Sequence, residues 1–368
     1  MSAFEARTRR CQQRLRERDA SGAVLFPSPN CYYLAGFREE PGERHLFLFV
    51  PADGDPAFVA PELYDEQLRE ATWVADVRTW ADGEDPTELV AETASDLGMT
   101  DGELLVDPTM WARFTQDLRA ALPDATWGLA DDVLAPLRVR KDDAELDALG
   151  RAADAADAAI QDVRNLGADA VGMTERDLAA FVEDRLAAHG GDGTSFETIV
   201  GSGPNGAKPH HHRSEREIRR GDPVVLDFGT RVDGYPSDQT RTVVFAGDPP
   251  EEFERVHDVV REAQQAAVDA VEPGVPAEDV DAAAREVIEN AGYGDQFVHR
   301  TGHGVGLDVH EEPYIVDGND RPLEAGMVFS VEPGVYLDGE FGVRIEDLVA
   351  VTDDGCRRLN DTPRGWRP

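Results

Sequence analysis

Two aspartates, Asp227 and Asp238, lie in a segment whose pattern otherwise predicts a buried β-hairpin, and they constrain this chain more than any other feature. The apolar run 224–226 leads into Asp227, and residues 240–245 supply the returning strand. Two carboxylates buried close together repel each other, and burying them without partners is costly. A divalent cation between them removes both penalties. The pattern therefore indicates a metal site or, if this strand face is solvated, an ordinary pair of surface aspartates.

The turn of this hairpin sets its register. Asp-Gly at 233–234 is a strong signal for a two-residue turn between antiparallel strands. That turn places Asp227 opposite Thr240. Asp238 then becomes the diagonal neighbour of Asp227 on the same face, within about 7–8 Å of it.

The charge of the chain excludes several classes of partner. Its 368 residues include 74 acidic and 36 basic residues, which give a formal net charge of −38. Nucleic acids and anionic membranes require a basic surface, so neither is expected to bind. High acid content with only two lysines resembles proteins of salt-accumulating archaea, in whose molar salt the Debye length is about 3 Å. We therefore attribute the surface acid to the solvent, and acidic residues need context before they are given a role.

The chain has no sign of export or membrane insertion. No apolar run approaches the roughly 20 residues that cross a bilayer. The arginine-rich residues 7–18 are accompanied by the acidic residues Glu5, Glu17 and Asp19, which predicts an opening amphipathic helix rather than a transit peptide. The three cysteines are scattered and odd in number, so a disulfide framework is not expected. We expect a cytoplasmic protein.

The pattern divides near residue 137, and the length allows two cores. Residues 1–137 predict a small α/β accessory domain, with strands at 23–26, 45–50, 58–60, 74–79 and 104–106 and helices at 61–72, 87–97 and 109–122. Residues 138–368 predict the second domain. Its expected helices lie at 142–165, 250–271 and 276–291, and a further helix begins after Thr174, which could cap it.

A second pair of carboxylates follows about a hundred residues after the hairpin. Glu332 ends an apolar strand, and Glu346 lies inside another. Their apolar neighbours indicate that neither is surface decoration. The alternative is a buried salt bridge with Arg344 as the cation. One arginine cannot neutralise four carboxylates, so this alternative fails if all four converge.

Histidines gather in two places. His299, His303 and His310 fall within twelve residues, among glycines that permit close approach by a metal or a substrate. The glycine spacing is not that of a phosphate-binding or dinucleotide turn. His210 lies in the loop 201–212, which is rich in glycine and proline, and a solvated loop without function is the alternative there.

The order and spacing of these motifs resemble the pita-bread metallopeptidases, in the branch that contains aminopeptidase P and Xaa-Pro dipeptidase (prolidase). The resemblance covers residues 138–362 and rests on Ser-Gly-Pro-Asn-x3-Pro-His210, Asp227-Phe-Gly-x8-Asp238-x-Thr-Arg-Thr, Gly-His303-Gly-x-Gly-x3-His310-Glu, Val-Glu332-Pro-Gly and Arg344-x-Glu346-Asp. It implies an α/β (α+β) protein, with an N-terminal creatinase-type domain and a C-terminal pita-bread domain. In the latter, helices cover a curved, mostly antiparallel sheet.

The resemblance also implies a site with two divalent metal ions. Its implied ligands are Asp227, Asp238, His303, Glu332 and Glu346. Four carboxylates and one imidazole suit Mn²⁺, with Co²⁺, Fe²⁺ or Zn²⁺ as alternatives. A hydroxide that bridges the two metals would attack the peptide carbonyl.

The remaining roles are implied by the same resemblance. Glu332 would also carry a proton from the nucleophile to the leaving nitrogen. Three histidines would contact the substrate and the tetrahedral intermediate: His210, His299 and His310. Arg344 and Thr240 would orient the carboxylates.

The expected function is an Xaa-Pro aminopeptidase, an exopeptidase that releases the residue before proline. Its substrate is a peptide with proline at the second position, and the resemblance implies a homodimer. An Xaa-Pro dipeptidase is the alternative. Tyr314 stands where some prolidases place the arginine for the substrate carboxylate, which favours the aminopeptidase unless another arginine serves. Methionine aminopeptidase, a creatinase-like C–N hydrolase and a non-catalytic pseudo-peptidase that binds a partner are further alternatives.

Overall fold

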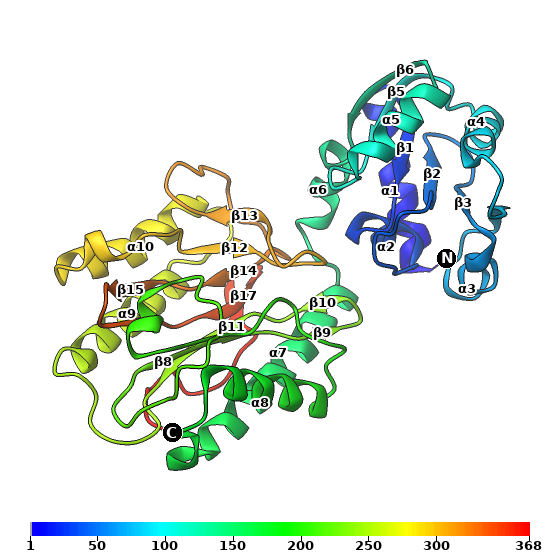
Figure 1. The fold of residues 1–368 in the computed structure, drawn as a ribbon. Helices are drawn as coiled ribbons and strands as arrows, with labels where there is room; N and C mark the ends of the chain where they lie inside the picture. The colour runs from blue at the N-terminus through cyan, green and yellow to red at the C-terminus, as the bar shows by residue number, and fades with distance from the viewer. Residues whose placement is uncertain (1) are drawn as a thin grey trace. The chain divides into compact units, whose positions relative to one another are not determined.

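The computed structural model describes residues 2–368, which form two compact units divided between Arg138 and Val139 (Figure 1). Each unit has its own sheets, helices and apolar core. None of the helices within residues 2–368 is both long and apolar enough to span a membrane.

The first unit is built on a six-stranded mixed sheet with the strand order β4-β3-β2-β1-β5-β6. The β1–β2 and β2–β3 pairs are antiparallel, and the other pairs are parallel. The strands are β1 (Ala20–Leu25), β2 (Phe47–Pro51), β3 (Ala57–Pro61), β4 (Asp76–Trp80), β5 (Asp101–Val106) and β6 (Asp124–Leu129). The helices are α1 (Ala3–Glu17), α2 (Pro29–Ala35), η1 (Glu62–Tyr64), α3 (Asp65–Ala71), α4 (Pro86–Asp96), α5 (Ala112–Ala121) and α6 (Asp131–Arg138).

Strand β6 was not predicted from the sequence. It is an edge strand in which no residue is fully buried, so its apolar pattern is weak. The predicted helix 61–72 is divided into the 3₁₀ turn η1 and the short helix α3. The other predicted strands and helices of this unit are present, with ends that differ by a few residues.

The first half of the second unit packs two helices against a three-stranded antiparallel sheet in the order β11-β8-β7 (Figure 1). Both helices begin with a capping box, one at Asp142 and one at the predicted Thr174. The elements are α7 (Asp143–Asn165), η2 (Gly167–Ala170), α8 (Glu175–Ala188), β7 (Ile199–Ser202), η3 (Gly203–Ala207), β8 (Val224–Phe228), β9 (Arg231–Val232), β10 (Tyr235–Pro236) and β11 (Gln239–Val243).

The second half repeats this plan with α9 and α10, which share a core with the strands β14 to β17. Its larger sheet is antiparallel in the order β13-β12-β14-β17-β18, and β15 pairs with β16. The elements are α9 (Phe253–Asp269), α10 (Ala277–Asn290), η4 (Gly294–Gln296), β12 (Gly302–Gly304), β13 (Glu311–Ile315), β14 (Val328–Val331), β15 (Gly334–Leu337), β16 (Phe341–Arg344), β17 (Asp347–Thr352) and β18 (Gly355–Arg358).

The aspartate hairpin has the predicted register. Asp227 of β8 lies opposite Thr240 of β11, and the turn falls at 233–234 between β9 and β10. Asp233 and Gly234 both have positive φ, which this type of turn requires. The turn residues therefore fix which side chains of the two strands face each other.

Candidate metal centre

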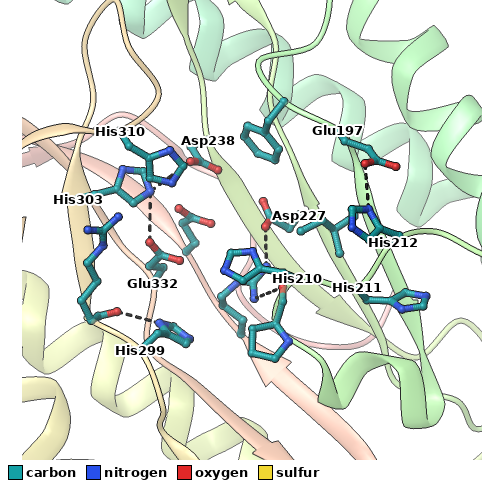
Figure 2. A pocket seen from close by; sticks show the side chains of 16 residues that line it. Glu197, His210, His211, His212, Asp227, Asp238, His299, His303, His310 and Glu332 are labelled. Atoms are coloured by element: carbon teal, nitrogen blue, oxygen red, sulfur yellow. Dashed lines mark hydrogen bonds and ion pairs between the residues drawn. The ribbon is translucent and has the colours of Figure 1, made fainter. Parts of the chain in front are cut away.

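The predicted site residues line one cavity of about 290 Å³ in the second unit. Figure 2 shows the aspartates of the hairpin facing His303, His310 and Glu332, which come from the second half of the unit. The cavity is lined by Asp227, Asp238, Glu332, Glu346, Arg344, His210, His299, His303 and His310. Thr240 is fully buried and contacts Glu346 from outside the cavity.

Thr240 joins the two halves of the unit. Its hydroxyl donates to Glu346 Oε2 at 2.6 Å, and its carbonyl accepts from the Glu346 backbone N–H at 3.1 Å. Arg344 Nε donates to the same hydroxyl at 3.1 Å. Glu346 is 106 residues away from Thr240 along the chain and is nevertheless fixed beside the aspartate hairpin.

Three of the proposed ligands form a compact group. Single ligand atoms of Asp238, His303 and Glu346 all lie within 4.8 Å of one another, and all three residues are buried. His303 Nε2 lies 3.3 Å from Glu332 Oε1 and 3.6 Å from Asp238 Oδ2. Asp227 lines the same cavity, so four carboxylates and one imidazole share it, which the pattern of residues alone did not require.

The protein supplies little positive charge to this group. Arg344 pairs with Asp227 Oδ2 at 2.5 Å. Within residues 2–368, no lysine or arginine forms an ion pair with Asp238, Glu332 or Glu346. Two buried carboxylate oxygens at the centre, Asp227 Oδ1 and Glu346 Oε1, have no hydrogen-bond partner within residues 2–368. Buried polar atoms rarely stay without partners, so this donor set fits divalent cations.

The surroundings disfavour charge on these carboxylates unless a cation is bound. Burial raises the pKa of Asp238 well above its ordinary value, and the neighbouring Glu346 and Asp227 raise it further. Burial also raises the pKa of Glu346 well above its ordinary value, followed by repulsion from Glu332 and Asp227. The pKa of Asp227 is raised by burial in spite of the Arg344 guanidinium. A divalent cation would reverse this balance by stabilising the ionised forms.

His303 is held in the form that can coordinate a metal. Burial lowers its pKa to about 4, so its ring is neutral at pH 7. Its Nδ1 lies 3.2 Å from the Gly304 carbonyl oxygen. Because a carbonyl oxygen can only accept a hydrogen bond, Nδ1 must be the donor. The proton is therefore on Nδ1, and the Nε2 lone pair faces Asp238 and Glu332. Ser330 Oγ accepts from the His303 backbone N–H and donates to Glu332 Oε1, both at 3.1 Å.

The other histidines occupy different parts of the cavity. The His310 ring contacts the His303 ring at a tilt of 41°, with centroids 4.0 Å apart, and its pKa is lowered to about 4 by burial and then by His303. His299 Nε2 is hydrogen-bonded to the Tyr336 hydroxyl at 2.8 Å, and burial lowers its pKa. His210 lines the cavity from the loop after β7.

Three residues of the site were not predicted from the sequence. The Tyr336 hydroxyl accepts from Arg344 NH1 at 2.9 Å and donates to His299 Nε2, because the His299 proton lies on Nδ1 facing the Arg300 carbonyl. Ser330 lies on β14 and Glu332 directly follows the strand, so the two are separated by one residue and face the same way. That alternation was the available signal for Ser330. Arg300 lines the cavity beside His299, and no pattern in the sequence distinguished it from other arginines.

Comparisons with known proteins identify a family for each of the two units. Residues 147–353 match metallopeptidase family M24, and residues 7–140 match the creatinase/prolidase N-terminal domain. The chain is 38% identical over 367 residues to the Xaa-Pro dipeptidase of Lactobacillus helveticus, with 96% of each chain covered.

Two solved structures are similar over nearly their whole length. The prolidase of Thermococcus sibiricus has a TM-score of 0.94 and 41% identity, covering 100% of this chain and 99% of that one. The dipeptidase PepE of Mycobacterium ulcerans has a TM-score of 0.90 and 42% identity, covering 99% and 97%. These matches and the mixed α/β architecture of both units show that the chain belongs to metallopeptidase family M24.

Proposed function

We propose that this protein is an Xaa-Pro dipeptidase whose site holds two divalent cations. The observation that carries the proposal is that four carboxylates and one neutral imidazole line one cavity, and two of the carboxylate oxygens are buried without hydrogen-bond partners within residues 2–368. The proposed ligands are Asp227, Asp238, His303, Glu332 and Glu346. Bound there, the ions would polarise the peptide carbonyl and make a water nucleophilic at neutral pH. Mn²⁺ remains the proposed metal because carboxylates dominate the donor set.

The sequence favoured an aminopeptidase, but the comparisons support the dipeptidase alternative better. The relatives compared above, which are 38–42% identical to this chain, are named as dipeptidases or prolidases. An X-Pro aminopeptidase of Thermotoga maritima with similar coverage is 31% identical. The aminopeptidase expectation rested on Tyr314, which replaces an arginine of some prolidases. A second arginine can take over that role.

Arg300 is the arginine in a position to do so. Its guanidinium lies over the Tyr314 ring, 4.4 Å from the centroid, and its side chain lines the cavity. It forms no ion pair with a carboxylate of residues 2–368. A free cation beside the site suits the C-terminal carboxylate of a dipeptide, and the aromatic ring holds the guanidinium flat.

The chain's own residues suffice for the proton transfers and for substrate binding. Glu332 would take a proton from the attacking water and deliver it to the proline nitrogen that leaves. His310 and His210 would donate hydrogen bonds to the substrate as negative charge develops on its carbonyl oxygen. One such donor is commonly worth about 2.7–4 kcal/mol. Both ring nitrogens of His299 are engaged, by the Arg300 carbonyl and the Tyr336 hydroxyl, so His299 would contact the substrate through its ring carbons.

The test compares three substrates with the metal-loaded enzyme at high salt: an Xaa-Pro dipeptide, its C-terminal amide, and an Xaa-Pro-Yaa tripeptide. We expect the dipeptide to have the highest kcat/KM. Failure to release the first residue from all three would contradict the proposal. A clear preference for the tripeptide would restore the aminopeptidase.

Arg300→Met tests the carboxylate site separately. It should raise KM for the dipeptide about 10-fold, the loss of one charged contact, and leave the amide substrate unchanged. Arg300→Lys serves as the matched control and should retain part of the preference. Equal effects on the dipeptide and its amide would show that Arg300 does not bind the carboxylate.

A further inference from the structure

Glu175 is a buried carboxylate outside the metal centre that gathers an unusual number of donors. It is the first residue of α8, and its side chain is fully buried. Oε1 accepts from the Ser202 backbone N–H and hydroxyl, both at 2.8 Å, and from Asn205 Nδ2 at 3.0 Å. Oε2 accepts from His211 Nε2 at 2.7 Å and from the Ser214 hydroxyl and N–H at 2.6 and 3.1 Å. A carboxylate offers about four lone-pair sites, so its capacity is saturated.

These donors surround one loop. Ser202 ends β7, and Ser214 lies on the returning segment, so the two serines flank residues 203–213, which we call the histidine loop. Asn205 and His211 lie within it. The backbone strengthens the far end, since Glu175 N–H donates to Arg216 O at 3.0 Å and Arg176 N–H donates to Ser214 O at 3.2 Å. One side chain thus ties both ends and the interior of the loop together.

Hydrogen bonds rather than a neighbouring arginine or lysine keep Glu175 ionised. Arg216 pairs with Asp222 at 2.6 Å and donates to the Ser202 hydroxyl. Within residues 2–368, no lysine or arginine pairs with Glu175, whose contact with His211 Nε2 at 2.7 Å is a hydrogen bond. Burial raises the pKa of Glu175, but the donors led by Ser214, Ser202 and His211 lower it to about 2 overall. The carboxylate is therefore charged at neutral pH, and its donors are oriented toward it.

The histidine loop matters because it carries cavity-lining side chains. His210 and His211 both line the cavity. His210 makes no side-chain hydrogen bond to residues 2–368, so the loop backbone sets its position. On the cavity side, the Pro209 carbonyl accepts from Arg344 NH1 at 3.4 Å, and His212 Nδ1 lies 3.1 Å from Glu197 Oε2.

We propose that Glu175 is the positioning residue of the histidine loop and holds His210 and His211 in the cavity before substrate binds. The loop part of this inference is independent of the proposed function, whereas its kinetic part rests on it. Glu175 touches neither the substrate cavity nor a proposed metal ligand and acts only through the loop.

The decisive variant is Glu175→Gln. The glutamine side chain has the same shape as glutamate. Its NH₂ group, however, would replace an oxygen that accepts three hydrogen bonds, and it would face those three donors without being able to accept from them. Hydrogen exchange measured by mass spectrometry on the full-length enzyme should become at least about 10-fold faster in residues 203–214 and stay unchanged in α9 and α10. In ¹⁵N-histidine spectra, the His211 Nε2–H signal, assigned with His211→Asn, should shift or broaden. Unchanged exchange in residues 203–214 and an unchanged His211 signal would overturn the inference.

Asp177→Asn is the matched control. Asp177 lies in the same first turn of α8 and completes its capping box, but it does not reach the loop. This variant should lower thermal stability without faster exchange in residues 203–214. If it accelerated loop exchange as much as Glu175→Gln, a general weakening of α8 would explain both results and the inference would fall.

Kinetics and a second variant complete the test. Glu175→Gln should raise KM for an Xaa-Pro dipeptide about 10-fold with a smaller effect on kcat, because substrate contacts are lost while metal content stays constant. Should Glu175→Gln fail to fold, Ser214→Ala removes a single donor, and the same exchange readout should show a smaller acceleration; no change there would overturn the inference. A wild-type enzyme without peptidase activity would refute the proposed function, whereas the exchange result would still decide the role of Glu175.

Discussion

Two groups of buried carboxylates in the same unit have opposite surroundings. At the metal centre, Asp227 Oδ1 and Glu346 Oε1 lack hydrogen-bond partners within residues 2–368, and burial raises the pKa of both residues. At the base of the histidine loop, Glu175 is just as buried but accepts six hydrogen bonds, and its pKa falls to about 2.

The comparison distinguishes a buried carboxylate whose charge is stabilised by the protein's own hydrogen-bond donors from carboxylates whose charge requires a bound cation. A buried charge is tolerated only when something compensates it. The donors around Glu175 belong to the protein, so its compensation is built into the fold. At the metal centre, Arg344 compensates Asp227 alone, and the proposed cations would compensate the other carboxylates.

The largest expected effect comes from neutralising a member of the metal centre. Glu346→Gln should lower kcat at least about 1,000-fold, or roughly 4 kcal/mol in activation free energy, and reduce the metal content. In the presence of chelator, the same variant should be at least as stable as wild type, because one repelling carboxylate is gone. Activity assays, metal analysis and thermal unfolding measure the three quantities. A marked loss of stability in chelator would show that Glu346 is compensated by the protein, as Glu175 is.

The corresponding change at Glu175 should act through stability and depend on pH. The pKa of Glu175 is depressed from 4.5 to about 2, and at pH values above 4.5 this shift stabilises the folded state by roughly 3 kcal/mol. This contribution is lost as the pH falls from 4.5 toward 2, because the unfolded chain takes up its proton first. The gap in unfolding free energy between wild type and Glu175→Gln should therefore be widest at neutral pH and narrow in acid. A gap that does not vary with pH would contradict an ionised Glu175.

The smallest expected effect comes from the residue that joins the hairpin to Glu346. Thr240→Val keeps the shape but removes the hydroxyl that donates to Glu346 Oε2 and accepts from Arg344 Nε. Metal affinity should fall about 10-fold with little change in fold, the usual size for losing a group that orients a ligand. Titration with Mn²⁺ measures it, and Thr240→Ser is the control that keeps the hydroxyl. Equal affinities of the valine and serine variants would remove Thr240 from this role.

Local patterns allowed the hairpin to be predicted because its turn fixes the register, and Asp227 lies opposite Thr240 as expected. The approach of Glu346 to that hairpin depends on packing between segments 106 residues apart, and only the family resemblance indicated it. Glu175 was missed for a different reason. An acid at the start of a helix is an ordinary capping signal, and nothing local shows that a loop 27–39 residues later closes over it.

The most direct test of the central claim is anomalous diffraction from crystals grown with Mn²⁺. We predict two peaks about 3.5–4 Å apart in the cavity, the usual spacing of a two-metal site, bounded by Asp227, Asp238, His303, Glu332 and Glu346. A map without manganese in contact with these five side chains would contradict it.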